Sequence, residues 1–214
     1  MRALAVTPIH LPPEEIRRRQ ARYDRLAPPG LAVELRDVGP AAPGSLDDEA
    51  SVRASEREVA AALAGARQGF DLAFPDCVLD PAVPDGPADQ GVPVNGLLKL
   101  SGMHLAAANV RFGAVVRNEA IGAELGRRLK GYGLEAYVAG IAILELPFDA
   151  IADADAWNAA LAEAVDALAA AGAAAVINGC SAVDVEEDRF AARVVDPTAL
   201  ALKLMTLTTA GRSA

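Results

Sequence analysis

The most restrictive feature of this chain is a spacing of landmarks that occurs twice. Gly69 and Cys77 bracket the segment FDLAFPD, and Gly172 and Cys180 bracket the segment AAAVING. Both landmarks share one offset, because 180 − 77 = 103 and 172 − 69 = 103. We therefore interpret the chain as two copies of one unit, each of which ends a strand in a cysteine.

Strands and helices alternate through both copies. A Gly-Leu pair precedes the second predicted strand of each copy, at 30–31 and again at 133–134. The strands are predicted at 2–8, 31–38, 70–76, 111–116, 134–139 and 173–179, and the helices at 13–26, 48–68, 97–109, 118–131, 154–171 and 197–210. Strands separated by helices imply right-handed βαβ units and parallel sheets.

The predicted fold is therefore α/β, with two pseudo-symmetric, flavodoxin-like subdomains of parallel sheet. We expect residues 1–94 together with 198–214 to form the N-terminal lobe and residues 95–197 to form the C-terminal lobe. Because ligands of open parallel sheets bind outside the carboxyl ends of the strands, we expect the active site in the cleft between the lobes.

Several side chains have simple structural interpretations. Asp47 or Asp48 is a plausible N-cap for the helix at 48–68. The charged run 14–19 predicts a solvated helix with i,i+4 ion pairs, such as Glu14 with Arg18. We expect Trp157 to anchor the alanine-rich helix at 154–171, either in the core or at a subunit contact, and His104 to pack within its helix.

Composition excludes several classes of partner. The formal net charge of −9 and the pI near 4.7 disfavour binding to nucleic acid phosphates or to anionic membrane surfaces. No stretch approaches the roughly 18–20 apolar residues that span a bilayer. Prolines soon follow the apolar start 1–6, which we interpret as a buried strand of a cytoplasmic protein. We expect a small-molecule substrate and a homo-oligomer.

The two cysteines suggest proton transfer. Two cysteines do not form a disulfide framework in a chain of 214 residues, and a reducing cytosol would keep them as thiols. His10 and His104 show no short ligand spacing to either cysteine, so we expect no metal. Both cysteines fall at strand ends, and equivalent groups on opposite faces of one carbon suit racemisation, in which a base removes a proton and an acid returns it.

Cysteine fits this chemistry because its ordinary pKa, about 8.5, lies near neutrality. We expect the N-terminus of a following helix to favour the thiolate, with N–H groups supplied by the segment Ser181-Ala182-Val183. The same N–H groups could bind a carbonyl oxygen as negative charge develops on it. The chemistry then requires neither pyridoxal phosphate nor a metal, so we expect no cofactor.

Five motifs, taken in order, resemble the aspartate/glutamate racemase superfamily and most closely its hydantoin racemase branch. They are Cys77-Val78-Leu79-Asp80-Pro81, Val92-Pro93-Val94-Asn95-Gly96, Arg111-Phe112-Gly113-Ala114-Val115-Val116, Asn178-Gly179-Cys180-Ser181-Ala182 and Val194-Val195-Asp196-Pro197. The resemblance covers nearly the whole chain. It implies that Cys77 and Cys180 act as paired acid and base.

Two loops depart from the pattern of that superfamily. Its first loop usually reads Asn-Pro-Asn-Thr, whereas this chain has Val6-Thr7-Pro8-Ile9-His10. The chain also has Arg117-Asn118-Glu119 where threonines are usual. These loops hold the polar groups of the substrate in the family. The predicted substrate-binding residues are Thr7, Pro8, His10, Val78, Arg117, Asn118, Ser181 and Ala182. The presence of both cysteines argues against the arylmalonate decarboxylase branch, which works with one.

Some of these residues could instead have purely structural roles. His10 could cap backbone instead of binding substrate, and Arg117 could be a surface arginine that opens a helix instead of gripping a carboxylate. Asp80 and Pro81 could shape the turn after Cys77.

The predicted function is racemisation or epimerisation of an amino-acid derivative, such as a hydantoin or a related ureido or amide compound. One alternative is a maleate-isomerase-like cis-trans isomerase with Cys77 as nucleophile. The other is a non-catalytic protein that binds a small molecule on the same fold.

Overall fold

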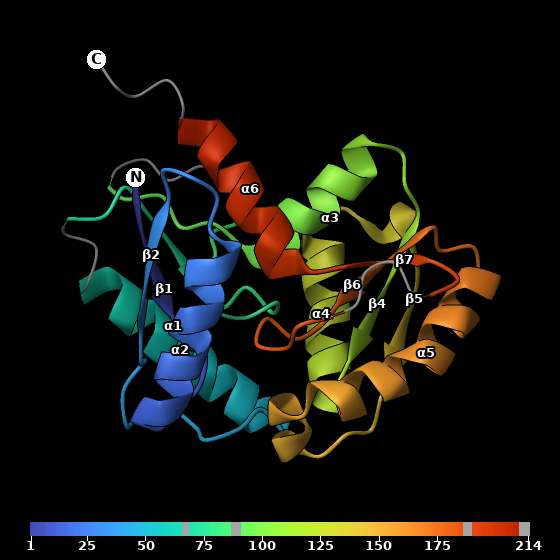
Figure 1. The fold of residues 1–214 in the computed structure, drawn as a ribbon, viewed down its shortest axis with the longest axis horizontal. Coiled ribbons are helices and arrows are strands. Elements are labelled where there is room, and N and C mark those ends of the chain that lie inside the picture. The colour runs from blue at the N-terminus through green and yellow to red at the C-terminus, as the bar shows by residue number, and fades with distance from the viewer. Residues whose placement is uncertain (66–68, 87–90, 186–189, 210–214) are drawn as a thin grey trace. The chain divides into compact units, whose positions relative to one another are not determined.

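The computed structural model describes the chain except for residues 66–68, 87–90, 186–189 and 210–214. The chain forms two compact units (Figure 1). The first unit comprises Met1–Leu100 and Thr198–Ala214, and the second comprises Ser101–Pro197. The boundary thus falls inside helix α3 (Leu97–Ala107), whereas the sequence suggested a boundary before this helix.

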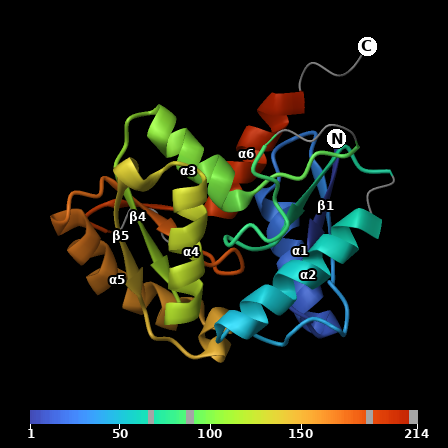
Figure 2. The ribbon, with the colours of Figure 1, turned by 180° about the vertical axis from the view of Figure 1, so that it is seen from behind.

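The first unit contains a parallel sheet in the order β2-β1-β3. Its strands are β1 (Arg2–Val6), β2 (Ala32–Arg36) and β3 (Leu72–Pro75), and an isolated parallel bridge joins Ala73 to Val94. Helix α1 (Pro13–Leu26) and helix α2 (Glu49–Gly65) lie on opposite faces of this sheet (Figures 1 and 2).

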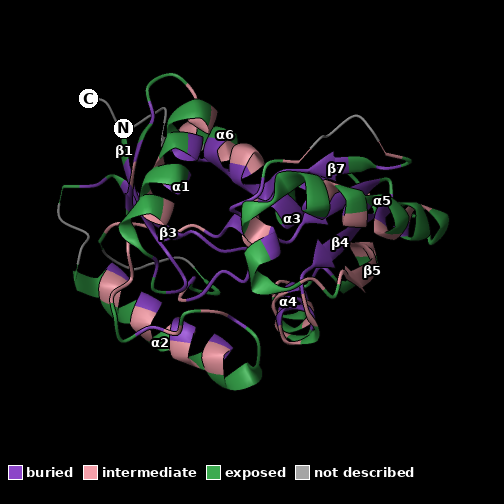
Figure 3. Cartoon of the chain, turned by 60° about the horizontal axis from the view of Figure 1, so that its bottom comes forward, coloured by how far each residue is buried: buried purple, intermediate pink, exposed green. Residues whose placement is uncertain are grey.

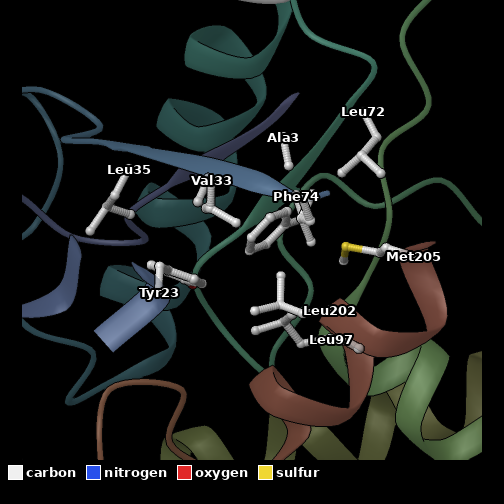
Figure 4. Packing of buried hydrophobic residues seen from close by; sticks show 12 residues of the cluster. Ala3, Tyr23, Val33, Leu35, Leu72, Phe74, Leu97, Leu202 and Met205 are labelled. Carbon is white, nitrogen blue, oxygen red and sulfur yellow. The ribbon is translucent and has the colours of Figure 1, made fainter. Parts of the chain in front are cut away.

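Alternate residues of the strands point to opposite faces of the sheet and belong to two separate hydrophobic clusters. On the α1 face, Tyr23 packs with Phe74, and helix α6 (Pro197–Thr209) adds Leu202 and Met205 (Figure 4). On the α2 face, Val59 and Leu63 pack against the residues of β1 and β3 that point the other way. This double coverage explains why β3 is buried along its whole length.

The second unit contains a parallel sheet in the order β5-β4-β6-β7. Its strands are β4 (Phe112–Val116), β5 (Val138–Ile143), β6 (Ala175–Asn178) and β7 (Arg193–Val195). Its remaining elements are α4 (Glu119–Gly131), α5 (Ala154–Ala170) and the 3₁₀ turns η1 (Glu135–Tyr137) and η2 (Phe148–Ala152).

Helix α5 covers one face of this second sheet. Trp157, Leu161 and Val165 of α5 are fully buried there and pack with Val115 and Val176. On the other face, Gly122 of α4 allows close approach to Val116 and Ile143. The inner strands β4 and β6 are buried at every residue, whereas the edge strand β5 is only partly buried (Figure 3). Trp157 therefore has the core anchoring role predicted for it.

The prediction of an α/β fold with parallel sheets is confirmed, and most predicted elements are present. Helix α1 begins at Pro13 and α6 at Pro197, where proline suits the first turn. Asp48 caps α2, since its side chain accepts a hydrogen bond from Ser51 N–H at 2.7 Å. The predicted ends of two helices, at 66–68 and at 210, lie outside the described residues.

Two predictions were wrong in detail, and one strand was missed. The strand predicted at 134–139 lies at Val138–Ile143, because η1 occupies the residues before it. Strand β7 was not predicted, because a run of only three residues carries little periodic signal. His104 is exposed on α3 instead of packed. Within the ranges that the structure describes, no helix has the length and hydropathy needed to cross a bilayer.

Candidate active site

Both cysteines follow their strands at equivalent positions. In the first unit, Asp76 N–H donates to Val6 O at 2.7 Å, and Cys77 comes next. In the second unit, Gly179 N–H donates to Val115 O at 2.7 Å, and Cys180 comes next. The repeat found in the sequence is thus a repeat of hydrogen bonds, and it brings each thiol to the carboxyl edge of its own sheet.

Cys77 lies in a tight turn. Asp80 N–H donates to Cys77 O at 3.2 Å, and Leu79 N–H donates to Cys77 Sγ at 3.4 Å. The cysteine is buried, with 7% exposure, and the next residue, Val78, is more deeply buried still. A backbone N–H that points at sulfur favours the thiolate over the thiol.

The backbone at Cys180 is bound by the side chain of Asn178. Trp157 Nε1–H donates to Asn178 Oδ1 at 3.1 Å, and Asn178 Nδ2–H donates to Cys180 O at 2.8 Å. Cys180 is partly exposed, and Ser181 and Ala182 after it are buried. The buried amide of Asn178 therefore fixes the backbone at this second cysteine.

The expectation of a helix N-terminus directly after the cysteines was wrong. Residues 78–82 and 181–183 are turns and bends, and the next helices, α3 and α6, begin at Leu97 and Pro197. The N–H group that reaches Cys77 comes from the turn itself.

Asp80 connects the turn after Cys77 to helix α3. Its carboxylate accepts hydrogen bonds from Leu98 N–H at 3.1 Å and from Lys99 N–H at 2.8 Å. It is fully buried and has a positive φ of 50°. Gly96 lies directly against it, since a Cβ there would stand 2.2 Å from Asp80 Oδ2. The interpretation of Asp80 as a turn-forming residue agrees with these contacts.

Sequence reasoning missed Asp37, which organises the loop after β1. Thr7 Oγ1–H donates to Asp37 Oδ1 at 3.3 Å, and Leu11 N–H donates to the same oxygen at 2.9 Å. His10 Nδ1 lies 2.7 Å from Asp37 Oδ2. Burial alone would raise the pKa of Asp37, but its hydrogen bonds with Leu11, His10 and the Gly39 N–H lower that pKa from its ordinary value of 3.8.

These contacts separate the predicted residues of the first loop. Thr7 is fully buried and its hydroxyl also accepts from Val38 N–H at 2.9 Å, while Pro8 is buried with its carbonyl bound by Ser55 Oγ–H at 2.6 Å. The His10 side chain is about half exposed and is paired with a carboxylate, not used to cap backbone.

Arg117 and Asn118 follow β4 in the second unit. Arg117 is 5% exposed, donates from Nη1 to Leu146 O at 3.3 Å and lies 5.7 Å from the centre of the Phe148 ring. The interpretation of Arg117 as a surface arginine was therefore wrong. Asn118 is the N-cap of α4 and accepts from Ile121 N–H at 2.9 Å.

The structure thus groups the predicted residues by unit. Those of the first unit follow β1 and β3, which are adjacent, and those of the second follow β4 and β6, which are also adjacent. The members are Thr7, Pro8, His10, Cys77 and Val78 in the first unit, and Arg117, Asn118, Cys180, Ser181 and Ala182 in the second. Among the residues described, no group of three or more His, Cys, Asp or Glu side chains is arranged to hold a metal ion.

Solved structures share this fold. Allantoin racemase from Klebsiella pneumoniae is 22% identical with a TM-score of 0.79, and the match covers 98% of this chain and 88% of that one. Allantoin racemase from Pseudomonas fluorescens is 19% identical with a TM-score of 0.82, and the match covers 100% of this chain and 93% of that one. Arylmalonate decarboxylase is 16% identical with a TM-score of 0.62, covering 100% of this chain and 94% of its own. No curated protein matches the chain significantly.

The chain thus has the α/β fold of these solved structures, with one cysteine after a strand of each unit. A family model described as Asp/Glu/Hydantoin racemase matches residues 14–205. The chain belongs to the Asp/Glu/hydantoin racemase family, and the resemblance predicted from its motifs is confirmed.

Proposed function

We propose that this chain is a cofactor-independent racemase or epimerase that inverts a stereocentre in an amino-acid derivative of the hydantoin class. The observation that supports this most is the equivalent placement of Cys77 and Cys180, each one residue beyond the same hydrogen bond in its own unit. Family membership supports the type of reaction. Solved allantoin racemases of similar fold support a cyclic ureide as the kind of substrate.

In the proposed reaction, the thiolate of one cysteine removes the proton from the carbon next to a carbonyl. The carbon–hydrogen bond breaks, its electron pair moves into an enolate, and the sulfur gains the proton. The thiol of the other cysteine then delivers its proton to the opposite face of the carbon and becomes the thiolate. Atoms and charge balance, and the two cysteines exchange roles for the reverse direction.

Two features support these acid and base roles of the cysteines. The Leu79 N–H that donates to Cys77 Sγ stabilises negative charge on that sulfur. A ring carbonyl stabilises the enolate without a cofactor when N–H donors meet its oxygen. We propose that the turn residues Ser181 and Ala182 supply such donors, and that His10 contacts a polar group of the substrate.

The remaining predicted residues have local roles in the proposed site. The hydroxyl of Thr7 and the side-chain oxygen of Asn118 take part in local hydrogen bonds, so these residues shape loops. Pro8 and Val78 supply buried surface. Arg117 remains a proposed partner for a carboxylate or a carbonyl oxygen.

The test uses enantiomerically pure 5-substituted hydantoins and allantoin, with inversion followed by circular dichroism. We expect inversion that persists after dialysis against EDTA, and loss of inversion in Cys77→Ser and Cys180→Ser. Absence of inversion with all of these substrates, or full activity in either variant, contradicts the proposal. A covalent adduct at Cys77 with maleate would instead support the isomerase alternative.

A further inference from the structure

The helix that follows the first strand of each sheet, α1 after β1 and α4 after β4, carries the same set of polar residues. In each, one glutamate binds an arginine three residues later and another four residues later, and a tyrosine follows four residues beyond the second arginine. The sets are Glu15, Arg18, Arg19 and Tyr23 on α1, and Glu124, Arg127 and Arg128 on α4 with Tyr132 as its C-cap. Their offset is 128 − 19 = 109, whereas the cysteines differ by 103, because the second copy has a shorter connection after its tyrosine.

In the first unit this set reaches the residue before Cys77. Arg19 Nη1–H donates to Asp76 Oδ2 at 3.0 Å, and Tyr23 O–H donates to Asp76 Oδ1 at 2.7 Å. Arg19 also binds Glu15 at 2.8 Å. The side chains of Arg19 and Asp76 are 6% and 1% exposed, so this is a buried ion pair with its hydrogen bonds well satisfied.

In the second unit the same position is Gly179. A Cβ at Gly179 would stand 2.1 Å from Val115 O, so the backbone there has no room for a side chain. The pair Arg128 and Glu124 is retained on α4, with an N–O distance of 2.7 Å. At the position before the cysteine, the first unit therefore has a buried carboxylate and the second has a glycine.

We propose that Asp76, Arg19 and Tyr23 form a positioning network that holds the Cys77 turn and balances the charge beside its thiol. The network makes Cys77 chemically different from Cys180, although both follow their strands in the same way. This inference rests on the proposed proton-transfer role of Cys77, since the network itself touches no reacting atom.

The physical reason is the charge that ionisation would create. A carboxylate one residue from Cys77 opposes a second negative charge on its sulfur, and the Arg19 guanidinium offsets that repulsion. The Tyr23 hydroxyl stabilises the same carboxylate, and burial followed by the charge of Asp76 raises the pKa of Tyr23 well above its ordinary value of 10. Tyr23 thus stays protonated and remains a donor.

The experiment measures the pH dependence of alkylation by iodoacetamide, whose rate follows the thiolate. Cys77 is measured alone in a Cys180→Ser background. We expect Arg19→Met to raise the pH of half-maximal alkylation by about one unit, and Asp76→Asn to lower it. Arg18→Met is the matched control on the same helix, because Arg18 binds Glu15, as Arg19 does, at 2.7 Å. We expect it to leave the profile unchanged.

The second unit supplies a further control. In a Cys77→Ser background, Arg128→Met should leave the alkylation profile of Cys180 unchanged, because Gly179 offers no carboxylate there. Arg19→Lys keeps the positive charge and should restore most of the normal Cys77 profile. If Arg19→Met does not fold, Tyr23→Phe tests the network instead. We expect it to raise the pH of half-maximal alkylation of Cys77 by about half a unit.

Identical profiles for Arg19→Met, Arg18→Met and the parent would overturn the inference and leave the network a purely structural one. A shift of Cys180 by Arg128→Met as large as that of Cys77 by Arg19→Met would overturn the claimed difference between the units. The alkylation profile needs no substrate, so its result stands apart from the inversion assay. Failure of the inversion assay alone would instead contradict the proposed function.

Discussion

The two units place a cysteine at the same position and surround it differently. In the first unit Cys77 follows a buried aspartate that is tied to α1 by an arginine and a tyrosine. In the second unit Cys180 follows a glycine, and a neutral tryptophan–asparagine pair fixes its backbone. Duplication of one unit thus explains why the thiols are equivalent in position, and later divergence explains why they need not be equivalent in chemistry.

The largest expected effect comes from removing either thiol. We expect Cys77→Ser and Cys180→Ser each to lower kcat for inversion by about 10²- to 10⁴-fold, the usual contribution of a general acid or base. Each variant should still exchange the carbon-bound proton of one enantiomer with deuterated water, and the two variants should prefer opposite enantiomers. Proton NMR of each pure enantiomer measures this exchange. The same enantiomer preference in both variants would contradict the assignment of one cysteine to each face of the carbon.

A second prediction concerns the residue before Cys180. Gly179→Ala should destabilise the protein by about 3 kcal/mol, because its Cβ would overlap Val115 O. The control is Gly126→Ala on α4, where a Cβ meets only Ile141 Cδ1 at 3.5 Å. That change should be neutral or stabilise the helix by up to about 1 kcal/mol. Urea unfolding measures both, and equal stabilities would show that the close approach at Gly179 is not restrictive.

A third prediction compares two helix caps. Asp80→Ala should cost about 2 kcal/mol, because it leaves the buried N–H of Leu98 and the partly buried N–H of Lys99 without this acceptor. Asp48→Ala at the exposed start of α2 should cost only about 1 kcal/mol. Thermal unfolding of both variants tests the order. Asp80→Ala should also slow inversion, because Asp80 follows Cys77 in the same turn, and Asp48→Ala should not.

The smallest effect is expected where the units agree. Burial raises the pKa of Glu15 and of Glu124, but hydrogen bonds from their two arginines outweigh it, so each pKa lies below its ordinary value of 4.5. A carboxyl with a lowered pKa in the folded state stabilises the fold above its unfolded pKa, and this stabilisation is lost as the pH falls through the folded pKa.

We therefore expect Glu15→Gln and Glu124→Gln to flatten the decline of Tm between about pH 6 and pH 3 by similar small amounts. Differential scanning calorimetry across this range measures the decline. A flattening in only one variant would show that the repeated pairs differ in strength, as they would if contact between Arg19 and Asp76 changes the binding of Glu15.

Sequence reasoning predicted what local patterns encode. The repeat at 103 located both cysteines, and the prolines at 13 and 197 fixed the start of α1 and of α6. It misplaced β5 because residues 136–143 carry no charge and span both the end of η1 and the strand, and hydrophobicity alone does not divide such a run.

Sequence patterns did not predict contacts between residues far apart in the chain. The charged run on α1 predicted a solvated helix, yet Arg19 is buried because its partner, Asp76, stands 57 residues away. Asp37 was missed for a similar reason, since its hydrogen bonds return to Thr7, His10 and Leu11 of an earlier loop. The surroundings of the cysteines depend on tertiary contacts, which residue spacing in the sequence does not predict.

The most direct test of the account follows a single pure enantiomer of a hydantoin substrate through inversion in deuterated water. With one thiol for each side of the carbon, the newly formed enantiomer should carry deuterium from the first turnovers, while the unreacted enantiomer keeps its original proton. Chiral chromatography with mass detection separates and weighs both pools. Substantial retention of the original proton in the new enantiomer would show that one group serves both sides, and the paired action of Cys77 and Cys180 would have to be abandoned.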